Sequence, residues 1–381
     1  MRGHLTAGRG ALESALAAAA PAAPSPARAR ALDWAGILAQ QQGDYAEAAA
    51  RFRASLAVHR ELGHERGVAA GLHGLGNLAA LRGDLAEAAA LYEESLAMGR
   101  RSGDAEVQAA ALTNLGSVAE NRGDLGAARA LFEDGLALRR RLGDEHAIAL
   151  LTGNLGYVAF QEGDRPRARR LLDESLAIRR RLGDRAGTAN ALANLGSLAL
   201  AGGDLHLAAA HLAASLELAE AVGDLRGATL ARLRLARVAR ARGDLASAVE
   251  LDRRAVPPVG HLRAARTIAE WLEGMAATSV ALGDHQRAAA LLGAAARLRS
   301  TIGAPVPAGE RAAVADLAAR ARSALGDDAF ARAESAGATA GTAGVDGAVA
   351  LAWRDMPGAA HLGDDEGGDE GGDQGHGPMP R

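Results

Sequence analysis

Asparagine side chains recur at one place in a repeating pattern of this 381-residue chain. Asn114, Asn154 and Asn194 lie forty residues apart, each directly before a Leu-Gly pair, and Asn77 directly follows the preceding Leu-Gly pair. An amide both donates and accepts hydrogen bonds, so it can bind a ligand or bridge two structural elements. The row of amides therefore predicts either a ligand-binding surface or a structural ladder.

A second group of polar residues carries positive charge. Arg234, Arg237 and Arg240 follow one another at three-residue spacing, which places them on one face of a helix. Such a face suits an acidic peptide or nucleic acid, although it could equally be a solvated surface. The formal net charge of -3 and the aromatic content of 3% argue against direct nucleic-acid binding. The same charge argues against an anionic membrane as a partner.

Residues that could carry out catalysis or hold a metal are scattered along the chain. There is no cysteine, and none of the 11 histidines belongs to an H-E-x-x-H pattern. There is also no lysine, so the G-x-x-x-x-G-K-[ST] loop that cradles phosphates cannot occur. The sequence predicts no catalytic, cofactor-binding or metal-binding residues, and therefore a protein that is not an enzyme.

The elements that position these residues follow from a Gly-Asp repeat. Seven Gly-Asp pairs lie forty residues apart, from Gly43-Asp44 to Gly283-Asp284, and further pairs such as Gly103-Asp104 fall halfway between them. A fixed period of this length is typical of stacked-repeat proteins, and the half-period indicates two similar elements per repeat.

Residues 65–102 illustrate one repeat. Apolar residues at three- and four-residue spacing predict a first helix over 65–82 and a second helix over 85–101. Gly83 can end the first helix in a left-handed conformation, Asp84 can cap the second, and Glu87 is placed to complete a capping box. The turns are so short that neighbouring helices must be antiparallel. Glycines in one register, which predict close helix approach, are Gly36, Gly76, Gly116, Gly156 and Gly196.

These motifs resemble the tetratricopeptide-repeat family over roughly residues 30 to 303. The first helix carries Leu-Gly, and the second carries Ala followed four residues later by an aromatic residue or Leu. The quoted pairs are Ala48/Phe52, Ala88/Tyr92, Ala128/Phe132 and Ala168/Leu172. We therefore expect an all-α fold, a right-handed α-α superhelix of about seven helix-turn-helix repeats.

The resemblance implies that the first helices line a concave groove that binds a protein or peptide. It further implies that asparagines there can hydrogen-bond the backbone of an extended peptide, with a structural bridge between helices as the alternative. The groove candidates are Asn77, Asn114, Asn154, Asn194, Tyr157, Arg234, Arg237 and Arg240.

Residues 289–338 are similar to the C-terminal end of bacterial LuxR-type and SARP-like transcriptional regulators, which combine a signal-transduction ATPase with a tetratricopeptide sensor. The shared features are an LLGAA-x-x-LR-like stretch, a proline-containing turn and an LGD-x-x-F-x-x-A-like stretch. The phosphate-binding loop and a helix-turn-helix segment are missing. The resemblance implies a sensor or interaction module of a bacterial transcriptional regulatory system. The alternative is a free-standing tetratricopeptide adaptor with no transcriptional role.

The sequence divides into four parts. We expect an N-terminal half-repeat helix and linker at 1–24, the solenoid at 25–303, a helical cap at 304–353 and a disordered acidic, Gly-rich tail at 354–381. The half-repeat leaves an apolar flank open, through which the protein could self-associate. Pro21 and Pro24 interrupt the Ala-rich stretch that could imitate a signal peptide, and no run approaches the ~18 apolar residues of a membrane span. We therefore expect a cytoplasmic protein.

Overall fold

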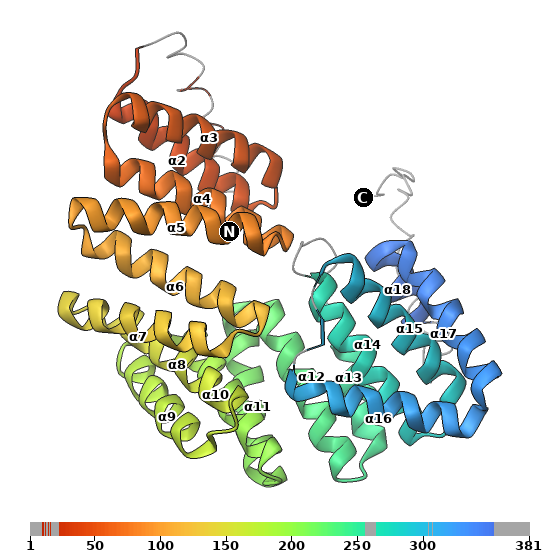
Figure 1. The fold of residues 1–381 in the computed structure, drawn as a ribbon. Helices are drawn as coiled ribbons and strands as arrows, with labels where there is room; N and C mark the ends of the chain where they lie inside the picture. The colour runs from red at the N-terminus through yellow and green to blue at the C-terminus, as the bar shows by residue number, and fades with distance from the viewer. Residues whose placement is uncertain are drawn as a thin grey trace, which may run out of the picture.

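The computed structural model describes residues 23–255, 264–303, 305–306 and 308–353, together with the single residues 10, 12, 14 and 16. All regular secondary structure in this part of the chain is helical (Figure 1). The predicted half-repeat helix therefore lies almost entirely outside the described residues, and the predicted acidic tail lies wholly outside them.

Fourteen of the helices form seven sequential pairs, which confirms the predicted all-α repeat solenoid. The first four pairs are α2 (Pro26–Gln41) with α3 (Tyr45–Glu61), α4 (Glu65–Arg82) with α5 (Leu85–Ser102), α6 (Ala105–Arg122) with α7 (Leu125–Leu142), and α8 (Glu145–Gln161) with α9 (Arg165–Arg181). The last three are α10 (Arg185–Ala201) with α11 (Leu205–Val222), α12 (Leu225–Ala241) with α13 (Leu245–Arg254), and α14 (Ala264–Ala281) with α15 (His285–Thr301). The chain continues through α16 (Ala308–Leu325), α17 (Asp327–Thr342) and α18 (Gly344–Trp353).

The Gly-Asp pairs form the turns between helices as predicted. Gly83 has a φ of 84°, a left-handed conformation that glycine adopts without strain, and the Asp84 carboxylate accepts the Glu87 N–H at 2.9 Å. The other half of the predicted capping box does not form. The Asp84 N–H donates to the Ala79 carbonyl at 3.0 Å, so the Glu87 carboxylate is free to accept from Arg82 instead.

The glycines in the shared register make room for a large side chain of the paired helix. A Cβ atom on Gly76 would lie 2.5 Å from the Tyr92 ring, and one on Gly116 would lie 2.5 Å from the Phe132 ring. These distances are too short for real contacts, so glycine is required where the two helices of a repeat cross. The predicted close approach is confirmed.

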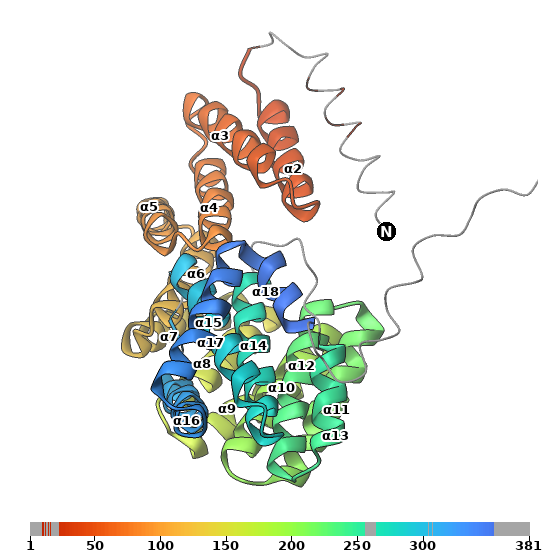
Figure 2. The same ribbon diagram turned by 90° about the vertical axis from the view of Figure 1, so that its right-hand side faces the viewer.

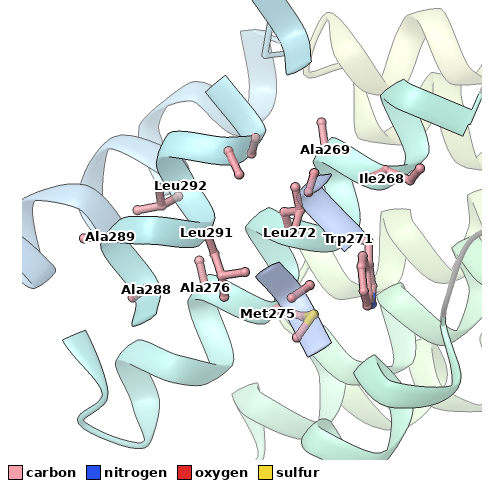
Figure 3. Packing of buried hydrophobic residues seen from close by; sticks show 14 of the residues in the cluster. Ile268, Ala269, Trp271, Leu272, Met275, Ala276, Ala288, Ala289, Leu291 and Leu292 are labelled. Carbon is pink, nitrogen blue, oxygen red and sulfur yellow. The ribbon is translucent and has the colours of Figure 1, made fainter. Parts of the chain in front are cut away.

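The C-terminal helices continue the packing of the last repeat. One cluster of buried apolar residues extends from α14 and α15 into α16, α17 and α18, with Trp271 fully buried within it (Figure 3). The α15–α17 crossing is close, because a Cβ on Gly337 would lie 1.8 Å from the Ala290 carbonyl oxygen. The C-terminal helices are therefore anchored firmly to the end of the array.

The array curves until its two limbs meet. Figures 1 and 2 show the repeats running from α2 through α10 and turning back toward α14–α18. Arg266 in α14 donates to the Asn121 side chain of α6 at 2.6 Å, across 145 residues of sequence. The Ile302 carbonyl oxygen, at the end of α15, lies 3.3 Å from where a Cβ on Gly83 would be. The concave side is thus open between the N-terminal repeats and bridged in its central part.

Among the described helices, α11 alone matches a membrane-spanning helix in length and mean hydropathy. It packs between α10 and α12 as the second helix of the fifth pair, in register with the second helices of the other repeats. This match of composition is weak evidence for a membrane span.

Candidate functional site

The N-terminal first helices line an open cavity of about 500 Å³ on the concave side, hereafter the groove cavity. Phe52 from α3 lies at its base, where the nearly buried ring packs between Gly36 of α2 and Gly74 of α4. The wall residues from the first helices are Asp33, Ile37, Gln40, Arg66, Ala69, Ala70, His73, Asn77, Glu106, Val107 and Ala110. Ser95 and Arg139 contribute from second helices.

The acidic side chains at the groove cavity already have partners within the protein. Asp33 accepts hydrogen bonds from Ser55 at 2.5 Å and pairs with His59 at 3.2 Å. Glu106 forms an ion pair of 2.6 Å with Arg139. Because these charges are satisfied, the cavity offers little to a charged ligand.

The basic side chains at the cavity are paired as well. Arg66 lies 3.6 Å from Asp104, and Arg139 also contacts Asp144 at 3.1 Å. Burial lowers the pKa of His73, so this imidazole is neutral at pH 7. The polar groups of the groove cavity that still lack a partner are therefore mostly uncharged.

Asn77 presents an amide to this cavity. Its Oδ1 atom accepts the Tyr92 hydroxyl at 2.7 Å, which fixes the orientation of the amide. Within the described residues, its Nδ2 atom makes no hydrogen bond, and Gln40 on α2 likewise keeps its side-chain amide unpaired. Two first helices in succession therefore present amide groups that can bind a peptide backbone.

Asn114 lies next to this site on α6. Its Nδ2 atom is 3.3 Å from Nε2 and 3.4 Å from Nδ1 of His73 on α4, a long contact between neighbouring first helices. The contact is the structural bridge that we gave as the alternative to ligand binding. It leaves Oδ1 of Asn114 without a partner among the described residues.

Asn154 and Asn194 lie further along the concave side and outside the groove cavity. Both are half-buried, and Asn194 donates to Asn190 of the same helix at 3.4 Å. The structure thus places Asn77 at the cavity and Asn114 beside it, in contact with the cavity residue His73, and leaves the other two predicted asparagines one and two repeats beyond Asn114.

A second polar region lies where the limbs of the array meet, hereafter the central polar cluster. Its members come from five helices and interact through their charges. They are Glu120 (α6), Tyr157 (α8), Arg234 (α12), Glu270 (α14) and Glu310 (α16). Burial raises the pKa of Glu120 to about 7 despite the opposing effect of Arg266. Burial, followed by the charge of Glu120, raises the pKa of Tyr157 to about 12, and burial also raises the pKa of Glu270. Burial lowers the pKa of Arg234. The cluster therefore carries a considerable desolvation penalty.

The three arginines predicted to share a face do not act as one basic wall. Arg237 is half-exposed and forms an ion pair of 3.0 Å with Glu310 of α16. The Arg240 side chain points inward, where it bonds to Asp252 at 3.0 Å and to Thr278 at 2.8 Å. The prediction that Arg240 faces the groove is therefore corrected: its guanidinium group forms an ion pair with the buried carboxylate of Asp252 on α13.

Several residues of the groove cavity escaped the sequence analysis. Ile37 and Gln40 were not selected, although Ile37 lies forty residues before Asn77. The repeat register was therefore the signal that could have found them. Also missed was a buried bond between paired helices, in which Ser175 donates to the Ala149 carbonyl at 2.7 Å and Ser215 to the Ala189 carbonyl at 2.7 Å. Within the described residues, no three His, Asp or Glu side chains come together as a metal site.

Comparisons with known proteins show which family has this architecture. The tetratricopeptide-repeat family model matches residues 27–101, 67–141, 107–181 and 145–221, which together span 195 of the 381 residues. No curated protein matches the chain in sequence.

Three solved structures with a similar fold are informative. A Rap protein complexed with competence and sporulation factor has a TM-score of 0.54 and 13% identity, over 92% of this chain and 99% of that one. The Rap conjugation gene regulator of plasmid pLS20, in complex with the Phr* peptide, has a TM-score of 0.57 and 16% identity, over 71% of this chain and 73% of that one. A signal-transduction ATPase from Pyrococcus horikoshii with a tetratricopeptide-repeat sensor has a TM-score of 0.51 and 15% identity, over 65% of this chain and 39% of that one. Identities this low show a shared fold only. The family match covers more than half of the sequence, and on that basis this chain belongs to the tetratricopeptide-repeat family.

Proposed function

We propose that this protein is a non-enzymatic scaffold that binds an extended peptide segment of a partner in the groove cavity. The observation that carries the proposal is the free amide nitrogen of Asn77, held in place by Tyr92 at the wall of a cavity of about 500 Å³. An extended backbone exposes alternating N–H and C=O groups, and side-chain amides can bind both. The unpaired amides of Gln40 and Asn77 lie on successive first helices and suit such a ligand.

The fold and the charges support this kind of ligand. The Rap regulator of plasmid pLS20 has a similar fold and was solved with a bound peptide, which agrees with the proposal at the level of fold. The charged residues at the cavity already form ion pairs within the protein, which disfavours nucleic acid and phosphate ligands.

We further propose that the protein works in the cytoplasm as a sensor or interaction module of a bacterial transcriptional regulatory system. The resemblance of residues 289–338 to the end of such regulators supports this setting. A neighbouring reading frame that encodes a P-loop ATPase would support it further. A free-standing adaptor without a transcriptional role is the alternative, and an unrelated gene neighbourhood would favour it.

A display library of random short peptides provides the probe. Selection on the wild-type protein should enrich a peptide, whose affinity is then measured by fluorescence anisotropy for a set of variants. Asn77→Asp keeps the acceptor for the Tyr92 hydroxyl but removes the free N–H donor, and Asn114→Ala removes the neighbouring amide. Each change should weaken binding about two- to tenfold, the value of one net hydrogen bond.

Variants further along the concave side and a control variant complete the set. Asn154→Ala and Asn194→Ala report how far along the concave side the peptide extends, and Glu93→Gln on the exposed face of α5 serves as the control. If the library enriches no peptide, or if every variant binds the selected peptide like the control, the groove cavity is not the binding site.

A further inference from the structure

The first helix of the array, α2, has one face that no neighbouring repeat covers. In every later pair the first helix packs against the second helix of the preceding pair, whereas α2 opens the array of described pairs (Figure 1). On the uncovered face of α2, Trp34 is 59% exposed, and Ala31 and Leu38 are only half-buried. An apolar face at the end of a stacked array is the surface that one more repeat would cover.

The forty-residue register shows that a covering helix is what α2 lacks. Residues forty apart occupy equivalent places in successive first helices. The equivalents of Ala31 and Leu38 in the next five first helices are all buried, namely Gly71, Ala111, Leu151, Ala191 and Ala231, and Leu78, Val118, Val158, Leu198 and Val238. Ala31 and Leu38 are therefore accessible because a neighbour is missing, and not because of their place in the helix.

The next repeat shows how such a face is covered. A Cβ atom on Gly71 of α4 would lie 3.2 Å from the Leu56 Cβ of α3. A Cβ atom on Gly74 of α4 would lie 2.8 Å from the Phe52 ring of the same second helix. These two places on a first helix are thus contacted by two places, four residues apart, on the second helix that precedes it.

The N-terminal segment has apolar residues at both of these places. Shifted back by one repeat, the two contacts become Leu16 against Ala31 and Leu12 against Trp34. The second contact reverses the sizes found in the next repeat, because the bulky ring now belongs to the first helix and the smaller side chain to the second. Leu5 likewise stands forty residues before Tyr45, the first residue of α3.

The residues of this segment that the structure describes have the character of a second helix. Gly10, Leu12, Ser14 and Leu16 are helical, and the Ser14 hydroxyl donates to the Gly10 carbonyl at 2.9 Å. Leu12 and Leu16 are four residues apart and so lie on one face of a helix. They are half-buried, whereas Ser14 is exposed.

We propose that residues 5–19 dock on α2 as the second helix of a preceding half-repeat, with Leu12 on Trp34 and Leu16 on Ala31. The register selects this chain's own segment as the occupant, and the connection is long enough. Six residues, 20–25, separate the segment from α2, whereas three residues, 62–64, connect α3 to α4. The inference does not depend on peptide binding in the groove cavity.

Pairs of cysteines in the full-length protein test the docking, since the chain has no cysteine of its own. Leu16→Cys with Ala31→Cys uses the contact whose equivalent Cβ atoms in the next repeat would be 3.2 Å apart, close to the separation in a disulfide. Ser14→Cys with Ala31→Cys is the control, because it has nearly the same tether but starts from an exposed residue. Mild oxidation of dilute protein should close the first pair within one chain roughly tenfold or more faster than the control pair, since the tether alone gives both the same effective concentration.

Tryptophan fluorescence gives a second readout. In a Trp353→Phe background the remaining emitters are Trp34 and the fully buried Trp271. A docked segment covers Trp34, so acrylamide should quench the emission only weakly. Leu12→Asp should increase the quenching and shift the emission to longer wavelength. Ser14→Asp puts the same residue on the exposed side of the segment and should change neither.

Three outcomes would overturn the inference. Equal oxidation rates of the two cysteine pairs would show that the segment does not dock on α2 in this register. Emission and quenching that Leu12→Asp leaves unchanged would show that Leu12 does not cover Trp34. Disulfide-linked dimers as the main product of the first pair, seen by sedimentation, would assign the face of α2 to the segment of a second copy. The peptide selection described above tests the proposed function separately, so either proposal can fail without the other.

Discussion

Glu120 provides a sharp test of how the two limbs of the array meet. Its carboxyl group is buried between α6 and the residues of α14, and burial raises its pKa from 4.5 to about 7. The opposing influence of Arg266, which is itself bonded to Asn121, is too weak to restore the ordinary value. The folded protein therefore favours the protonated form of Glu120.

The sign and size of the effect on stability follow directly. Between pH 4.5 and 7 the folded state binds a proton that the unfolded state has released, so stability falls as pH rises through this window. A difference of about 2.5 pKa units corresponds to about 3 kcal/mol, fully lost above the folded-state pKa. Glu120→Gln keeps the shape of the protonated acid and cannot ionise. It should match the wild type near pH 4.5 and exceed its stability by about 3 kcal/mol at pH 8.

Urea unfolding followed by circular dichroism at several pH values measures this difference. Glu93→Gln changes an exposed carboxylate on α5 and should give the same small offset at every pH. If the curves of wild type and Glu120→Gln run parallel from pH 4.5 to 8, Glu120 is solvated in solution and the limbs do not meet as described.

The packing of the repeats makes further predictions, all measurable by the same urea titration. Gly76→Ala should destabilise the protein by about 1–3 kcal/mol, because its Cβ would lie 2.5 Å from the paired aromatic ring. Gly126→Ala, whose Cβ has no neighbour closer than 3.8 Å, should be neutral or stabilising by up to about 1 kcal/mol, and equal effects of the two changes would contradict the packing. Arg240→Met leaves the buried Asp252 carboxylate without its cation and should cost about 3–5 kcal/mol. Adding Asp252→Leu should restore most of that loss, and no recovery would show that the pair is not coupled.

The fold could be predicted from sequence because its determinants are local and repeated. A glycine at each turn, an aspartate after it and apolar residues at helical spacing each act within a few residues, so Gly83, Asp84 and the bounds of α4 followed from the sequence alone. The glycine at 76 was recognised as a close approach for the same reason.

The candidate site was only partly predictable because it depends on contacts between distant parts of the chain. Asn114 was selected from the register, and Asn77 from its place beside the Leu-Gly pair of its own repeat. The ion pairs of Arg240 with Asp252 and of Arg237 with Glu310, in contrast, depend on how α12 faces α13 and α16. The repeat period carries no information about these relationships. The place of Ile37 and Gln40 at the groove cavity likewise depends on how α2 lies against α4 in space.

The most direct test of peptide binding in the groove cavity is a site-specific photo-cross-link. Ala70 lies exposed at the cavity on α4, and Ala90 lies exposed on α5, so a benzophenone amino acid can replace either with little effect on the core. With the peptide selected from the display library, the group at position 70 should cross-link to the peptide and the group at position 90 should not. Cross-linking at position 90 without cross-linking at position 70 would place the binding surface on the second helices and contradict the account.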